Sequence, residues 1–130
     1  MENGSFKGIE ILIVEDNPMN YYILKELINL IGNGAVCFWA KNGLEALDIL
    51  TKQENISLIL MDINMPEMDG ITATRKIREK KIDIPIIFQT AYASEKNKQE
   101  CFKAGGNDFL SKPLGADKLS SAIKKYLVKT

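Results

Sequence analysis

Short apolar runs recur along the chain at fairly even spacing. There are five of them, at residues 9–14, 35–40, 58–61, 84–88 and 108–110. The first, third and fourth are nearly continuous rather than alternating, which is typical of strands that are covered on both faces. We therefore predict five strands, with the most apolar ones buried between layers of helices.

The segments between the runs have helical periodicity. Apolar residues are spaced i, i+3, i+4 and i+7 at Leu24, Leu27, Ile28 and Ile31, and again at Leu119, Ala122, Ile123 and Tyr126. Asn42, Asp69 and Ser94 are good N-caps for the segments in between. These signals predict one helix after each strand, the last at residues 116–128. The helix after Ser94 has apolar residues only near its end, so we expect it to be weakly anchored.

Strand and helix therefore alternate five times, which predicts an α/β fold with a parallel sheet and helices on both faces. Right-handed crossovers leave few topologies for such a chain. We expect a single flavodoxin-like (βα)5 doubly wound parallel sheet with strand order 2-1-3-4-5. The polar, glycine-rich residues 1–8 are interpreted as a linker or an expression remnant, and residues 9–130 as the domain.

Composition narrows the chemistry that is open to this domain. The 130 residues carry 17 basic and 17 acidic side chains, so there is no basic excess of the kind that binds nucleic acid. The absence of histidine excludes Ser-His-Asp and Cys-His catalysis and the usual zinc sites. Cys37 and Cys101 are interpreted as free thiols.

No apolar run approaches the ~20 residues of a membrane span, and no signal peptide is evident, so we expect a cytoplasmic location away from the membrane.

Acidic residues stand at the ends of two predicted strands. Asp62 directly follows the apolar run in LILMDINMPEMDG, and Glu15 and Asp16 follow the first run. A lone buried carboxylate is costly, so such a group needs a partner. With strand order 2-1-3-4-5, ligands bind beyond the carboxyl ends of the first and third strands, where the order reverses. This topology places all three carboxylates around one crevice.

Three negative charges in one crevice need a cation. At ~5 Å and an effective dielectric constant of ~20, each pair of carboxylates repels by roughly 3 kcal/mol. Oxygen ligands without a nearby histidine or cysteine favour Mg²⁺ over zinc or copper. We therefore expect Glu15, Asp16 and Asp62 to form a magnesium site.

Two further residues are expected at the same crevice. Thr90 ends the fourth predicted strand, and Lys112 follows the fifth. The Lys112–Pro113 bond can be cis, which would turn the lysine back toward the acids. Carboxylate, magnesium, hydroxyl and lysine together form a phosphoryl-transfer site, with Asp62 as the nucleophile that forms an acyl phosphate. Each acid taken alone can also be a helix cap or a loop residue, and Asp69 is interpreted as a cap.

At these positions the chain resembles the receiver (response-regulator) domain of two-component signalling. The matching pieces are ILIVEDN, LILMDINMPEMDG, QTA and DFLSKPL, and the resemblance covers residues 9–128. The stretches EDNPMN and MDINMPEMDG resemble receivers fused to sensor kinases more than those joined to DNA-binding domains. The resemblance implies a signalling domain rather than a turnover enzyme, in the cytoplasm or in the cytoplasmic part of a membrane-bound sensor kinase.

The resemblance also implies a role for each site residue. Asp62 would be the phosphoacceptor, and Lys112 would pair with it and with the phosphoryl group. Glu15 and Asp16 would hold Mg²⁺ directly or through water, and Asn64 would give its backbone carbonyl to the metal. Thr90 would bind a phosphoryl oxygen, and Phe109 would be the aromatic switch. The phosphoryl donor is a phosphohistidine on a histidine kinase or a phosphotransfer domain. The surface of the fourth helix, fifth strand and fifth helix is expected to carry the signal, and a dimer through this surface is one option.

Some residues depart from the family pattern without touching the proposed chemistry. Gln89 stands before the threonine where an apolar residue is common, and Gly106 stands where alanine is usual. The pair Tyr21 and Tyr22 is also less typical of the family. The sequence indicates no part for these residues in phosphoryl transfer.

Two other functions remain open for the same residues. A phosphatase of the haloacid-dehalogenase type also uses an aspartate nucleophile, but it needs a second acid where this chain has Asn64. A flavodoxin-like FMN carrier needs a phosphate loop rich in Ser, Thr and Gly after the first strand, where Glu15 and Asp16 would repel a phosphate. Sustained turnover of a phosphomonoester would support the first, and a yellow colour the second.

Overall fold

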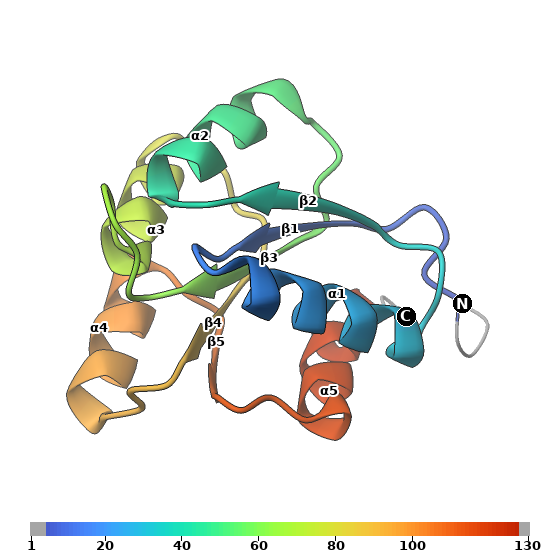
Figure 1. The fold of residues 1–130 in the computed structure, drawn as a ribbon. Coiled ribbons are helices and arrows are strands. Elements are labelled where there is room, and N and C mark those ends of the chain that lie inside the picture. Colours follow the sequence, from blue (N-terminus) through green and yellow to red (C-terminus); the bar gives the residue numbers. More distant parts are fainter. Residues whose placement is uncertain (1–4, 128–130) are drawn as a thin grey trace.

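The sheet has five parallel strands in the order β2-β1-β3-β4-β5 (Figure 1). The computed structural model describes residues 5–127. Its strands are β1 Glu10–Val14, β2 Val36–Ala40, β3 Leu58–Asp62, β4 Ile86–Thr90 and β5 Asp108–Ser111. Its helices are α1 Pro18–Ile31, α2 Gly43–Lys52, α3 Gly70–Glu79, α4 Glu95–Ala104 and α5 Ala116–Leu127. The predicted α/β fold, the flavodoxin-like strand order and the helix after each strand are thus confirmed.

The fourth strand begins two residues later than its apolar run. The run spans residues 84–88, whereas the strand occupies Ile86–Thr90 and ends at Thr90 as predicted. It starts late because Pro85 has no N–H to donate to the ladder. It extends beyond the apolar run because Gln89 and Thr90, although polar, still pair with β5. β3 and β5 likewise include a polar residue at their carboxyl ends, so an apolar pattern underestimates how far the strands reach toward the crevice.

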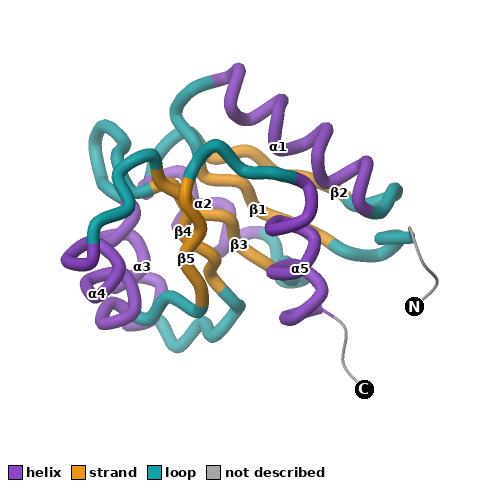
Figure 2. The backbone as a smooth tube through the Cα atoms, turned by 90° about the horizontal axis from the view of Figure 1, so that it is seen from below, coloured by secondary structure: helices purple, strands orange, loops and turns teal. Residues whose placement is uncertain are grey.

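The helices form two layers, one on each face of the sheet (Figures 1 and 2). α2, α3 and α4 cover one face, and α1 and α5 cover the other. Side chains along β1 alternate between the layers: Leu12 and Val14 pack beneath α2–α4, whereas Ile11 and Ile13 pack beneath α1 and α5. All residues of β3 and β4 are buried. Because both faces are covered, polar side chains can meet only where the strands end.

Phe6, ahead of the first predicted strand, belongs to the core of the fold. The segment 1–8 was interpreted as a linker, yet Phe6 is 1% exposed and packs in the core beneath α1 and α5. Its amide donates to the Asn33 carbonyl at 2.7 Å. Its ring lies so close to Gly32 that a Cβ on Gly32 would overlap with it. A single aromatic residue among polar and glycine residues has no periodicity, so the sequence pattern does not reveal its burial.

Polar residues begin the helices as predicted. Asn42, Asp69 and Ser94 each accept a backbone N–H, from α2, α3 and α4 respectively. α4 buries only Cys101 and Ala104, as expected for a weakly anchored helix. The last helix was predicted to reach residue 128, which lies outside the described residues.

One buried polar side chain in β4 is left without a partner. Gln89 is 1% exposed, and within residues 5–127 neither its carboxamide nitrogen nor its oxygen has a hydrogen-bond partner. Alternation along the strand places it on the same side as Ile87, facing α1 and α5. A buried, unpaired amide lowers the stability of the fold.

Arg78 of α3 ties together the loops at the amino ends of β4 and β5. Its Nε donates to the Gly105 carbonyl at 3.0 Å, and its Nη1 donates to the carbonyls of Ile82 and Ile84 at 2.8 and 2.9 Å. Its Nη2 donates to Asn107 Oδ1 at 2.9 Å. Lysine has a single nitrogen and cannot reach all four acceptors.

We expect Arg78→Lys to lower the free energy of unfolding by about 2–3 kcal/mol, because several carbonyls lose a charged donor. Arg75→Lys is the matched control, since Arg75 is exposed on the same helix. It should change the free energy of unfolding by less than ~0.5 kcal/mol. Urea denaturation followed by circular dichroism measures both. Equal values for the two variants would show that the Arg78 contacts contribute little.

Candidate functional site

Three carboxylates meet at the carboxyl ends of β1 and β3. These strands are parallel neighbours, with Val14 opposite Met61, so the residues that follow them come out at the same edge of the sheet. One carboxylate oxygen from each of Glu15, Asp16 and Asp62 lies within 4.8 Å of the others. Glu15 and Asp62 are buried, whereas Asp16 is exposed. The predicted convergence of the three acids is therefore confirmed.

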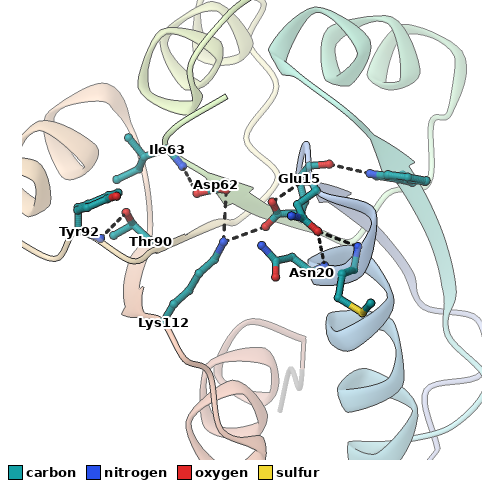
Figure 3. Close-up of polar contacts among 10 residues, drawn as sticks. Glu15, Asn20, Asp62, Ile63, Thr90, Tyr92 and Lys112 are labelled. Atoms are coloured by element: carbon teal, nitrogen blue, oxygen red, sulfur yellow. Dashed lines mark hydrogen bonds and ion pairs between the residues drawn. The ribbon is translucent and has the colours of Figure 1, made fainter. Parts of the chain in front are cut away.

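Lys112 reaches the same point from the loop after β5. Its Nζ lies 2.9 Å from Glu15 Oε1 and 3.3 Å from Asp62 Oδ2 (Figure 3). The Lys112–Pro113 peptide is cis, as the sequence suggested. The Lys112 amide also donates to the Thr90 carbonyl at 2.7 Å, which fixes its backbone beside β4. The lysine thus bridges two of the three acids and offsets part of their repulsion.

The charges and the burial of the cluster shift the pKa of both Asp62 and Lys112. Burial, and secondarily the negative charge of Glu15, raise the pKa of Asp62 from 3.8 to about 6, against the opposing pull of Lys112. Burial alone would lower the pKa of Lys112, but its hydrogen bond to Glu15 and the charges of both acids outweigh this and raise the pKa. The lysine therefore stays charged, while the ionised form of Asp62 is held at a cost.

The backbone around Asp62 is closely packed. Its Oδ1 accepts from the Ile63 amide at 2.8 Å. The amide of Gly70, at the start of α3, donates to the Ile63 carbonyl at 2.9 Å. A Cβ on Gly70 would overlap with the Asp62 carbonyl oxygen, so only glycine fits at this point of the loop. The sequence pattern indicates Asp69 as the cap of this helix but does not reveal the contact of Gly70 with Asp62.

Trp39, which was not among the predicted site residues, contacts the backbone of Glu15. The Nε1 of Trp39, on β2, donates to the carbonyl oxygen of Glu15 at 2.7 Å. The carboxylate of the same glutamate accepts from the Asn17 amide through Oε2 at 3.3 Å. The available signal was the position of the only tryptophan one residue before the end of a strand next to β1.

The other expected site residues lie around the acids without touching them in the described contacts. Thr90 is fully buried at the end of β4, and its hydroxyl accepts from the Tyr92 amide at 3.0 Å (Figure 3). Phe109 is half-buried on β5, opposite Phe88. Asn64 is exposed in the loop after β3. The structure thus brings together Glu15, Asp16, Asp62 and Lys112, and leaves the roles of Thr90, Phe109 and Asn64 as predictions.

The donor set suits a hard divalent cation. The three clustered groups are all carboxylates, and oxygen ligands of this kind are preferred by Mg²⁺. The buried pair, Glu15 and Asp62, carries two negative charges against the single positive charge of Lys112. The residues present therefore fit the magnesium ion that the sequence predicts.

A family model described as the response regulator receiver domain matches residues 11–124. This chain belongs to that family. The receiver domain of sensor histidine kinase PA1611 from Pseudomonas aeruginosa has a similar solved structure, with a TM-score of 0.81 and 35% identity over 92% of this chain and 97% of that one. That structure has a magnesium ion coordinated in its active-site cleft.

Two relatives differ in how much of their own length this chain spans. The osmosensing histidine protein kinase SLN1 of Saccharomyces cerevisiae is 37% identical over 92% of this chain, which spans only 10% of the kinase. Two-component response regulator 24 of Arabidopsis thaliana is 42% identical over 88% of this chain and 81% of its own length. Within residues 5–127, no helix combines the length and the apolar character needed to cross a membrane.

In magnesium-free buffer, we expect Asp62→Asn to raise the free energy of unfolding by roughly 1 kcal/mol, or Tm by a few degrees. The neutral amide is cheaper to bury and is not repelled by Glu15. Because the folded pKa of Asp62 is raised, its protonated form favours the folded state, and this stability is lost as pH rises from 3.8 through about 6. The advantage of the variant should therefore grow across this pH range.

Differential scanning calorimetry in EDTA, at several pH values across this range, measures the difference. Asp69→Asn is the control, since Asp69 is an exposed cap and asparagine caps equally well. Its effect should not change with pH in the same way. A lower Tm for Asp62→Asn at neutral pH would contradict the proposed repulsion.

Proposed function

We propose that this receiver domain accepts a phosphoryl group on Asp62 and passes the signal on by a change of conformation. The observation that carries the proposal is the cluster of Glu15, Asp16 and Asp62 bridged by Lys112, at the carboxyl ends of the strands of a receiver fold. The domain works as a signalling phosphoacceptor rather than as an enzyme that turns over a substrate.

The donor is a phosphohistidine on a histidine kinase or a phosphotransfer domain. The 130 residues contain no histidine, so the donor group lies outside them. The similarity to SLN1 supports attachment to a sensor kinase, whereas the similarity to the Arabidopsis regulator supports a stand-alone protein. In either case the domain meets its donor at the exposed rim of the crevice, where Asp16 lies.

In the proposed transfer, an oxygen of Asp62 attacks the phosphorus atom. An oxygen–phosphorus bond forms as the phosphorus–nitrogen bond of the donor breaks, and the electron pair of that bond returns to the imidazole. Oδ1 is held by the Ile63 amide, so we assign the attack to Oδ2, which lies 3.3 Å from Lys112. The charged lysine then neutralises negative charge on the phosphoryl oxygens.

Glu15, Asp16 and Asp62, with the backbone carbonyl of Asn64, would hold Mg²⁺ beside the acceptor. When bound, the ion supplies positive charge to the phosphoryl oxygens and to the crowded carboxylates. The all-oxygen donor set supports this assignment.

Thr90 and Phe109 are proposed to carry the signal away from Asp62. The Thr90 hydroxyl would leave the Tyr92 amide for a phosphoryl oxygen, and the ring of Phe109 would move inward behind it. The neighbouring helix α4 is held by only two buried residues, which suits an element with two arrangements. Figure 2 shows α4 and α5 on either side of the β5 edge, and this face would bind a partner or a second copy of the domain.

We expect Asp62→Asn to abolish labelling by a small phosphodonor such as acetyl phosphate, because the amide cannot form the acyl phosphate. Labelling is measured by intact-mass spectrometry in buffer with Mg²⁺. Asp69→Asn, in the exposed cap of α3, should label like the wild type. EDTA should stop labelling of both proteins that retain Asp62. Undiminished labelling of Asp62→Asn would show that another residue is the acceptor.

We expect Thr90→Ala to be labelled but to respond incompletely. With beryllofluoride and Mg²⁺ as a phosphoryl mimic, its ¹H–¹⁵N NMR spectrum should still change at Ile63, beside the acceptor. The changes at Phe109 and in α4 should shrink, because the hydroxyl that links them is missing. Thr90→Ser keeps the hydroxyl and should restore them. Full changes in α4 without any hydroxyl at position 90 would rule out this route.

A further inference from the structure

The peptide unit that joins the two acids after β1 is held by β2. The Glu15 amide donates to the Ala40 carbonyl at 2.9 Å, next to the last paired residues of β1 and β2. The Glu15 carbonyl, which belongs to the peptide unit between Glu15 and Asp16, accepts from Nε1 of Trp39 at 2.7 Å. β2 ends at Ala40, so a side chain rather than a strand supplies this second bond.

The indole ring of Trp39 is itself held in place. It stacks on Tyr21 of α1, with ring centroids 4.6 Å apart and planes 9° from parallel. Tyr21 is only 7% exposed, and Lys41 Nζ lies 5.3 Å from the centre of the indole ring. Rotation of the indole would break the stack, so the direction of its N–H is fixed. The stack also gives Tyr21, a residue less typical of the receiver family, a structural role as the support of the indole.

The orientation of the Glu15–Asp16 peptide unit determines where the two carboxylates point. The side chains leave from opposite ends of this unit, so its rotation would move both. The Glu15 carboxylate is buried against Lys112 (Figure 3), and Asp16 is exposed, yet their oxygens remain close enough to share an ion. Groups that orient metal ligands from outside raise the affinity for the metal.

We propose that Trp39 is a positioning residue for the magnesium site, acting through the Glu15–Asp16 peptide unit, with Tyr21 holding the indole in place. This inference rests on the proposed function, because it concerns the same metal site. It implies that the indole N–H and the bound cation influence each other, since the coupling between two linked sites is reciprocal.

The test compares Mg²⁺ affinity in variants that separate the hydrogen bond from the packing. Trp39→Phe removes the N–H donor but keeps a ring that can stack on Tyr21. Its Kd for Mg²⁺, read from the Ile63 amide in an NMR titration with magnesium chloride, should rise about tenfold. Arg78→Lys is the control, because it disturbs contacts at the amino ends of β4 and β5, away from the acids. It should leave the Kd for Mg²⁺ unchanged.

A second measurement uses the wild-type domain. Trp39 is the only tryptophan, so its indole N–H gives a single, assignable resonance. That resonance should move during the titration with the same midpoint as the Ile63 amide. This measurement decides the question even if Trp39→Phe fails to fold.

Each contrary outcome has a distinct meaning. An unchanged Kd in Trp39→Phe with a lowered Tm would show that the tryptophan serves stability alone and would overturn the inference. A stationary indole resonance while Ile63 responds would overturn it as well. No response of Ile63 to Mg²⁺ in the wild type would overturn the magnesium site of the proposed function, and the inference with it.

Discussion

The site depends on holding two buried carboxylates side by side at the end of a covered sheet. Glu15 and Asp62 leave neighbouring parallel strands, and either charge would be costly there without a partner. Lys112 comes from the far end of the chain and bonds both. Burial, and after it the negative charge of Glu15, raise the pKa of Asp62 to about 6 in spite of Lys112, so one lysine does not offset the whole cost of ionising both acids. The remaining negative charge and the all-carboxylate donor set suit this crevice to a divalent cation.

The two ends of the sheet contribute differently to this arrangement. At the amino ends of β4 and β5, the guanidinium of Arg78 joins two loops through four hydrogen bonds. At the carboxyl ends, the loops carry the acids, and α4 is anchored by only two buried side chains. The Arg78 contacts thus lie at one end of the strands, and the proposed change of conformation lies at the other.

Much of the site was predictable from the sequence, because its logic is topological. Continuous apolar runs alternating with helical periodicity specify a parallel sheet, and a parallel sheet brings all its carboxyl ends to one edge. Any acid or lysine that follows a strand must then lie near that edge. This reasoning was enough for Glu15, Asp16, Asp62 and Lys112, and the polar residues that begin the helices were equally readable because capping is local. The same topology placed Thr90 beside the crevice, whereas Phe109 was expected there only from the resemblance to receiver domains, and the contacts of neither residue were predicted.

Only the tertiary structure decided the contacts that hold the site in place. Phe6 enters the core from a segment without periodicity, and Arg78 bonds an asparagine 29 residues away. Trp39 bonds a carbonyl 24 residues away, just after the neighbouring strand β1. Gly70 is required because a backbone carbonyl from β3 occupies the space of a side chain. Residues of this kind carry no local pattern, since their roles depend on which surfaces the fold brings together. The sequence by itself therefore determined the chemistry and its location, whereas the packed structure determined how rigidly each group is held.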